Sequence, residues 1–179
     1  MLTLKQIEEA RSKALDILKQ SEIAVTQEEA ESIEISDYGL GDFKNTGLAI
    51  VVYVNTNRCC AKELVMLPHQ TCPQHRHPPF DDSPGKEETF RCRRGKCYLY
   101  VEGEPTATPA CKPPEGSEPY YTVWNEIVLE PGDQYTLQPN IWHWFQAGSE
   151  GAIVSEFSTR STDENDIFTD NHIVRKTGA

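Results

Sequence analysis

Residues 72–95, CPQHRHPPFDDSPGKEETFRCRRG, carry the spacing that decides the fold. His75 and His77 are two residues apart, Glu88 lies eleven residues after His77, and Gly95 lies seven residues after Glu88. Side chains two apart point the same way on a strand but diverge by roughly 200° on a helix, so the pair predicts a strand. The stretch between His77 and Glu88 is rich in Pro, Gly and Asp and predicts a loop. A second strand would then return Glu88 to the two imidazoles, and His143 offers a further imidazole downstream.

This spacing resembles a known family. His75, His77, Glu88 and Gly95 resemble the first cupin motif, whereas Pro131-Gly132-Asp133, Pro139 and His143 resemble the second. Nearly the whole chain is similar to the small cupin-type D-lyxose isomerases, through KELV at 62–65, HRHPP at 75–79, GKEETFRCR at 85–93, YLYVEGE at 98–104, HWFQAG at 143–148 and DIFTD at 166–170. The resemblance implies a single, jelly-roll-like cupin β-barrel. It also implies aldose–ketose isomerisation of a free pentose, D-lyxose to D-xylulose.

The resemblance implies a metal site formed by His75, His77, Glu88 and His143. A lone His is more often a hydrogen-bonded core or surface residue than a ligand. Four candidates at this spacing, on strands that a barrel brings together, favour a metal instead. Glu87 is the rival of Glu88, but adjacent strand residues face opposite ways, and the seven-residue step to Gly95 selects Glu88. Three nitrogens and one oxygen suit Mn²⁺, Co²⁺, Fe²⁺, Ni²⁺ or Zn²⁺, and we expect Mn²⁺.

Two charged residues lie in apolar, strand-like runs: Lys62 before the metal motif and Glu156 after His143. A buried charge is costly unless it pairs or serves a function, yet both residues could face solvent from a one-sided sheet. Because sugar-isomerase cupins carry a Lys and a Glu at such places, the resemblance favours function. It implies that Glu156 moves a proton between C1 and C2 through a cis-enediol, while the metal holds O1 and O2. Lys62 would bind a sugar hydroxyl or the oxyanion.

Other charged residues leave alternatives open. Lys86, Arg91, Arg93 and Arg94 form a basic cluster that could hold an anionic substrate, although a solvated strand face is the simpler interpretation. A phosphosugar isomerase of the glucose-6-phosphate type would need such an anion site. A cupin dioxygenase would need iron and an oxidisable substrate, and a non-catalytic sugar-binding cupin would need no base. Asp163 and Asp166 could belong to a sugar-binding lid or to a flexible terminus.

Periodicity and turn signals divide the chain into three parts of one expected domain, residues 1–179. Residues 1–36 predict two short helices, with capping boxes at Thr3 and Gln6 and at Thr26 and Glu29. Residues 47–158 predict an antiparallel sandwich or barrel, because short β-branched and aromatic runs alternate with turns, and the resemblance implies the barrel. These runs lie at 48–54, 60–67, 88–94, 96–101, 120–129, 134–137, 142–145 and 152–157. Residues 159–179 predict a polar tail that loops back over the barrel mouth.

Composition limits the classes of molecule that the chain can be expected to bind. A net charge of −11 argues against nucleic acid or an anionic membrane as partner. No apolar run approaches the roughly 20 residues of a membrane span, and the N-terminal residues show no apolar signal core. The six cysteines include no Cys-x-x-Cys pair, so we expect reduced thiols in the cytoplasm. The expected partners are therefore a small sugar and a second copy of the chain, because cupin barrels commonly form homodimers.

Overall fold

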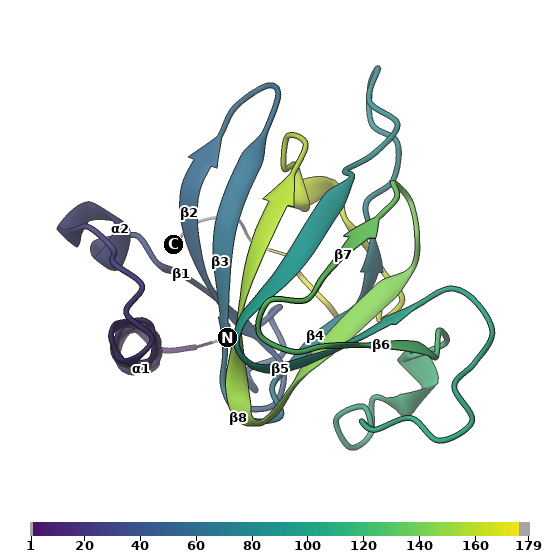
Figure 1. Cartoon of the computed structure of the whole chain (residues 1–179), viewed down its shortest axis with the longest axis horizontal. Coiled ribbons are helices and arrows are strands. Elements are labelled where there is room, and N and C mark those ends of the chain that lie inside the picture. The colour runs from purple at the N-terminus through teal and green to yellow at the C-terminus, as the bar shows by residue number, and fades with distance from the viewer. Residues whose placement is uncertain (1, 176–179) are drawn as a thin grey trace.

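The computed structural model describes residues 2–175, which form a curled nine-stranded sheet with two helices beside it (Figure 1). The helices are α1 (Leu4–Gln20) and α2 (Gln27–Glu31). The strands are β1 (Glu34–Ser36), β2 (Leu48–Asn55), β3 (Cys60–Met66), β4 (Thr71–Arg76), β5 (Glu88–Val101), β6 (Asn125–Leu129), β7 (Gln134–Leu137), β8 (His143–Ser158) and β9 (Ile167–Phe168). The predicted all-β barrel with N-terminal helices is confirmed. Residues 176–179 of the predicted tail lie outside the described residues.

Strand β8 closes the barrel because it pairs antiparallel with three other strands. Its C-terminal half pairs with β3, its N-terminal half pairs with β4, and β5 pairs with both halves. Strands β1 and β2 continue the sheet beyond β3, and β9 continues it beyond β4. Strands β6 and β7 pair with opposite ends of β5. Alternate side chains of all these strands therefore point into one interior.

Strands β5 and β8 are each longer than the sequence predicted, because each replaces two predicted runs. The prediction of a turn at Gly95 was wrong: β5 continues through this residue, which has φ +70°. A Cβ at Gly95 would lie 2.1 Å from the carbonyl oxygen of Gly151 in β8, so only glycine fits there. The β5–β8 register shifts on both sides of Gly95, and such bulges bend a strand. The glycine thus curls the sheet without ending the strand.

The N-terminal helices lie together on one outer side of the barrel (Figure 1). Both predicted capping boxes are present and fix the starts of α1 and α2. Helix α1 buries Ala14 and Leu18 against outward-facing Val65 and Ile153 of β3 and β8. Burial of each large aliphatic side chain contributes roughly 1.5–3 kcal/mol, so this layer stabilises one wall of the barrel. Within residues 2–175, no helix is long and apolar enough to cross a membrane.

A second outer cluster covers the opposite end of β8. Trp144 faces away from His143, because adjacent strand residues alternate, and it is fully buried. Its ring stacks on Tyr100 with centroids 4.0 Å apart, and Tyr121 meets its edge at 4.8 Å. Tyr121 belongs to the excursion between β5 and β6, which lies away from the helices (Figure 1). Because the excursion continues to residue 124, β6 begins only at Asn125, and the strand predicted from residue 120 is shorter than expected. The excursion therefore holds the His143 end of β8 in place from outside.

Candidate metal centre and active site

Three histidines from two strands meet inside the barrel. His75 of β4 and His143 of β8 are directly paired across the sheet, and His77 follows just after β4 ends. The ring centroids of His75 and His143 are 4.2 Å apart, and those of His75 and His77 are 4.9 Å apart. One nitrogen from each of the three rings lies within 4.8 Å of the others. This grouping can hold a metal ion, as the two-residue spacing of His75 and His77 indicated.

Glu88 joins the three imidazoles from the first position of β5. Its Oε1 lies 3.1 Å from Nε2 of His77 and 3.1 Å from Nε2 of His143. The Glu88 side chain is only 1% exposed. Glu87, by contrast, is exposed, in line with strand alternation. The structure therefore brings all four predicted ligands together and leaves the rival carboxylate outside.

Hydrogen bonds on the far side of each ring fix its orientation. Nδ1 of His75 bonds to the carbonyl of Pro73 at 2.8 Å, and Nδ1 of His143 bonds to the carbonyl of Ile141 at 2.9 Å. Nδ1 of His77 lies 2.5 Å from Oδ1 of Asp166. With Nδ1 donating, a neutral ring has its lone pair on Nε2, which is the arrangement that metal-binding imidazoles adopt.

The buried Nε2 of His143 tests whether a metal fits. Within residues 2–175 this atom has no hydrogen-bond partner, even though Oε1 of Glu88 is close. An unpaired buried polar atom is costly, and a cation at this point would satisfy it. Three imidazole nitrogens and one carboxylate oxygen also form a donor set that suits first-row divalent ions. The residues present therefore fit a divalent metal.

The charges of Glu88, His75 and His77 are set by their surroundings. Burial alone would raise the pKa of Glu88, but Lys86 and His77 hold it well below its usual range. Burial, with the neighbouring imidazoles, holds the pKa of His75 well below 6.5, so this ring is neutral. Burial and Lys86 would lower the pKa of His77, but Glu88 and Asp166 raise it to about 9. Without a metal, His77 therefore carries the proton that the ion would displace.

Lys62 and Glu156 face each other inside the barrel. They are directly paired across β3 and β8, and their side chains are each 5% exposed. The alternative in which both residues face solvent is therefore wrong. Nζ of Lys62 donates to Oγ of Ser161 and Oδ2 of Asp163, each at 2.8 Å, and lies 3.7 Å from Oε1 of Glu156. Burial alone would lower the pKa of Lys62, but these carboxylates raise it, so the ammonium stays charged.

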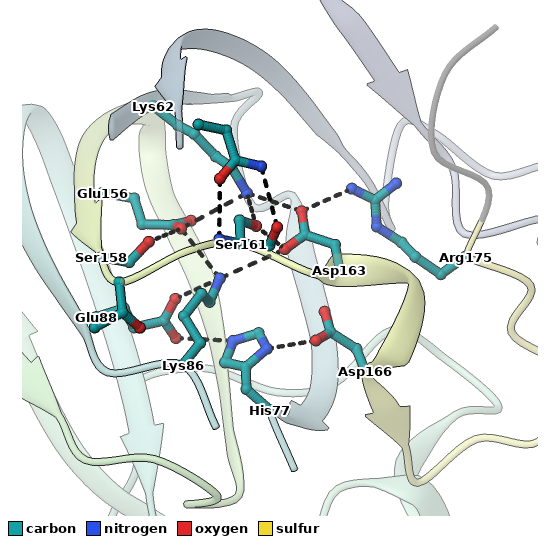
Figure 2. Close-up of polar contacts among 12 residues, drawn as sticks. Lys62, His77, Lys86, Glu88, Glu156, Ser158, Ser161, Asp163, Asp166 and Arg175 are labelled. Carbon is teal, nitrogen blue, oxygen red and sulfur yellow. Dashed lines mark hydrogen bonds and ion pairs between the residues drawn. The ribbon is translucent and has the colours of Figure 1, made fainter. Parts of the chain in front are cut away.

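Lys86 is the residue that the sequence reasoning misplaced. It was grouped with three arginines on a solvated strand face, yet its side chain is 5% exposed and points into the site (Figure 2). Nζ lies 2.9 Å from Oε2 of Glu88 and 3.0 Å from Oε1 of Glu156. The chain turns inward at Gly85, which has φ +108°. Only glycine fits there, because a Cβ would lie 2.4 Å from the carbonyl oxygen of His77. Lys86 and Glu88 are two residues apart, and this spacing was the overlooked signal.

The polar C-terminal segment returns to the site and supplies further charges (Figure 2). Asp163 lies 3.6 Å from Nζ of Lys86 and 3.3 Å from Arg175, as well as bonding Lys62. Burial would raise the pKa of Asp163, but Lys86, Lys62 and Arg175 hold it well below its usual range. Arg175 also forms an ion pair with Glu34. Sequence reasoning left Asp163 undecided and missed Arg175, because neither contact is encoded by local spacing.

The cavity between these groups is small. It has a volume of about 30 Å³ and is lined by His75 and His77, by Lys62, Lys86, Glu88 and Glu156, and by apolar residues such as Phe90 and Phe145. This is room for roughly two waters, and it is less than a pentose occupies. Lys62 and Asp163 also line a second, more open cavity of about 380 Å³. Because they line both cavities, these two residues stand between the wider cavity and the predicted ligands His75, His77 and Glu88.

Comparison with known proteins places the chain in a family. The chain is 63% identical to a D-lyxose/D-mannose isomerase of Thermosediminibacter oceani over 98% of this chain and 97% of that one. It is 59% identical, over the same shares, to a D-lyxose ketol-isomerase of a Thermofilum species. The model of the D-lyxose isomerase family matches residues 106–178. The chain belongs to the D-lyxose isomerase family.

Solved structures agree on the fold of this D-lyxose isomerase family member. The L-ribose isomerase of Acinetobacter sp. DL28 in complex with L-ribose superposes with a TM-score of 0.79. That comparison covers 96% of this chain and 94% of the other, at 14% identity. The L-ribose isomerase of Cellulomonas parahominis gives the same TM-score and coverage at 16% identity. Identities this low support the barrel architecture alone, so the roles of individual residues depend on the geometry above.

Proposed function

We propose that this chain interconverts D-lyxose and D-xylulose with a divalent metal held by His75, His77, Glu88 and His143. One observation carries the proposal: a buried carboxylate, Glu156, lines the same cavity as His75, His77 and Glu88 and shares Lys86 with Glu88. Burying two lysines among several carboxylates is expensive, and such clusters are a feature of catalytic sites. Membership of the D-lyxose isomerase family supports the substrate.

Charge balance supports a divalent ion. The buried cluster has five carboxylates and three permanently charged cations: Glu34, Glu88, Glu156, Asp163 and Asp166 against Lys62, Lys86 and Arg175. A divalent cation at the three imidazoles would neutralise the two excess negative charges. We propose Mn²⁺ as the native ion, with Co²⁺, Fe²⁺, Ni²⁺ and Zn²⁺ as alternatives that the same ligands accept. When bound, such an ion supplies Lewis-acid polarisation of the sugar carbonyl.

Glu156 is the proposed proton carrier. Its Oε1 accepts a hydrogen bond from Lys86 at 3.0 Å and one from Ser158 at 3.3 Å, and Lys62 lies nearest to the same oxygen. These contacts leave Oε2 as the oxygen that takes the proton from one sugar carbon and returns it to the next. The two lysines hold the carboxylate in a fixed orientation, and positioned carboxylates typically accelerate such transfers by roughly 10²–10⁴-fold.

Lys62 and Lys86 are the proposed donors to the sugar oxygens. Both ammonium groups line the cavity, and both carry several donor hydrogens. Negative charge develops on the sugar oxygens as the proton leaves carbon, and a nearby ammonium stabilises it. Because the cavity of about 30 Å³ does not admit a pentose, the sugar must displace part of the surrounding network. We propose that the sugar arrives from the wider cavity, past the Lys62–Asp163 ion pair.

The arginines argue against a phosphosugar as substrate. Arg91 is exposed, and Arg94 is used outside the barrel, where it donates to the carbonyl of Ile17 and to Ser21. The cations that line the cavity, Lys62, Lys86 and Arg175, already contact carboxylates. A phosphate group would meet Glu88, Glu156 and Asp163 at close range, and like charges in a buried site repel strongly. The arrangement therefore favours a neutral, free sugar.

The proposal is tested by assaying product from metal-stripped protein. We expect ketose formation from D-lyxose only after a divalent ion is restored, with Mn²⁺ giving the highest rate among the five ions. Parallel assays use phosphorylated aldoses and search for oxygen consumption with iron added. Turnover of a phosphorylated aldose in preference to D-lyxose would favour the phosphosugar alternative. Oxygen uptake would favour a dioxygenase, and sugar binding without turnover would favour a non-catalytic cupin.

We further propose a homodimer in a reducing compartment, the cytoplasm. Val54, Ala61 and Phe157 form a row across the outer face of β2, β3 and β8, in which Val54 is 38% exposed and Phe157 49% exposed. This apolar row is a candidate surface for a second copy. Light scattering should give twice the chain mass of 20.2 kDa, and a mass of one chain would contradict the dimer.

All six cysteines are free within the described residues, which suits a reducing compartment.

A further inference from the structure

The C-terminal segment touches two of the proposed metal ligands directly. Its short strand β9 pairs with β4, so that Phe168 lies opposite His75. The Phe168 ring stacks on the His75 ring, with centroids 5.4 Å apart and an angle of 25° between the planes. Oδ1 of Asp166 lies 2.5 Å from Nδ1 of His77 (Figure 2). The segment therefore contacts the side chains of two proposed metal ligands, His75 and His77.

The contact between Asp166 and His77 differs from those of the other two ligand rings. His75 and His143 are oriented by backbone carbonyls only two residues away in the chain. His77 instead depends on a side chain 89 residues away, which must be brought to it by the fold. A carboxylate makes a stronger, charge-assisted hydrogen bond than a carbonyl and makes the opposite nitrogen a better ligand.

The segment that carries Asp166 is fastened on both sides of it. Before Asp166, the backbone of Ser161 forms two hydrogen bonds with the Asn55 side chain, at 3.0 and 3.1 Å. After Asp166, the Thr169 amide donates to the carbonyl of Gln74 at 3.2 Å, and the Val174 amide donates to the carbonyl of Tyr38 at 2.9 Å. These bonds hold Asp166 over His77 without any contact from a metal.

We propose that Asp166 is a positioning residue for His77, and that metal binding and closure of the C-terminal segment (residues 161–175) are thermodynamically coupled. This inference rests on the metal site of the proposed function. Asp166 orients the His77 ring and holds its proton on Nδ1, so that Nε2 faces the metal position. By reciprocity, a segment that tightens the metal is itself tightened by the metal to the same extent in free energy.

The closing experiment measures Mn²⁺ affinity by competition with a chromophoric chelator. Asp166→Asn keeps the shape and an acceptor oxygen but removes the charge, and it should weaken Mn²⁺ binding by roughly 10–100-fold. Glu164→Gln removes a charge from an exposed position of the same segment and should leave the affinity within about twofold. Asp166→Asn should also lower the melting temperature of the metal-free protein, because it removes a charge partner of the buried, protonated His77. The readout that a merely structural role would leave unchanged is the rise in melting temperature on adding Mn²⁺, which should be smaller in Asp166→Asn than in Glu164→Gln.

Hydrogen exchange supplies the reciprocal measurement. Mn²⁺ should slow hydrogen exchange of the Thr169 amide, which donates to the carbonyl of Gln74 in β4. This slowing is expected in the wild type and in Glu164→Gln. The slowing should be smaller in Asp166→Asn. Wild-type affinity in Asp166→Asn, or unchanged exchange on adding Mn²⁺, would overturn the coupling. His77→Gln distinguishes failure of the proposed metal site from failure of the coupling. If His77→Gln leaves Mn²⁺ bound, the proposed metal site is wrong. If His77→Gln removes Mn²⁺ but Asp166→Asn does not weaken its binding, only the role of Asp166 is wrong.

Discussion

Lys86 donates a hydrogen bond from Nζ to Oε1 of Glu156 over 3.0 Å, deep inside the barrel. The same ammonium group lies 2.9 Å from Oε2 of Glu88, so one cation joins the proposed base to a proposed metal ligand. Burial would lower the pKa of Lys86, but Glu156, Glu88 and Asp163 hold it well above its usual value. Proton transfer and metal binding therefore share one electrostatic network, and substitutions within it should be non-additive.

Replacing Lys86 should damage both stability and activity. Lys86→Met fills a similar volume but leaves Glu88 and Glu156 without their shared cation, and removing one partner of a buried ion pair costs roughly 3–5 kcal/mol. Arg91→Met is the matched control, because Arg91 is exposed on β5, shortly after Lys86 in the chain. The control should change the free energy of unfolding by less than about 0.5 kcal/mol. Denaturant titration and turnover of D-lyxose, measured on both variants, check this prediction. Equal effects of the two substitutions would restore the view of Lys86 as one member of a surface basic cluster.

How far the sequence predicts this site depends on whether a contact is local. Strand alternation placed His75 and His77 together and chose Glu88 over Glu87, and the same rule, applied once more, would have placed Lys86 inside. The contacts of Asp166 with His77 and of Arg175 with Glu34 span 89 and 141 residues. They depend on the path of the C-terminal segment across the barrel, which no local pattern specifies.

The fold shows the same limit. Local sequence patterns predicted most of the strands and both capped helices correctly, because these depend on neighbours in sequence, whereas the barrel was implied by the family resemblance. The turn predicted at Gly95 was wrong, because the residue's positive φ is used for a bulge against Gly151 rather than for a chain reversal. A glycine signals an unusual backbone conformation, but only the packing partner decides whether the strand bends or ends.

The register of the metal site is tested by two adjacent glutamates. Glu88→Gln removes a proposed ligand charge and should weaken Mn²⁺ binding by more than the roughly 10–100-fold that outer partners contribute. Glu87→Gln changes an exposed carboxylate and should leave the metal content unchanged. Metal analysis of both proteins after gel filtration measures the difference. The opposite result, with Glu87→Gln losing the metal, would place the ligand one residue earlier in the strand.

Metal affinity should rise with pH up to about pH 9. In the metal-free protein the pKa of His77 is raised to about 9, so near pH 7 this ring is protonated and must lose a proton before Nε2 binds. The pKa values of His75 and Glu88 are held low, so neither adds a proton to be released. Binding of Mn²⁺ at pH 7 should therefore release about one proton, and affinity should increase roughly tenfold per pH unit between 7 and 9. Calorimetry in two buffers of different ionisation enthalpy counts the proton, and its absence would show that His77 is neutral before the metal binds.

Glu156 should be needed for proton transfer but not for metal binding. Glu156→Gln keeps the shape of a residue that is only 4% exposed, but its amide cannot take the proton, so turnover should fall by about 10²-fold or more. Mn²⁺ affinity should change far less, because no contact of Glu156 reaches the three imidazoles directly within residues 2–175. Running the wild-type reaction in heavy water adds an independent check: a cis-enediol route places solvent deuterium at C1 of the ketose. A fully active Glu156→Gln enzyme would remove Glu156 from the mechanism and leave Lys62, across the same strand pair, as the next candidate.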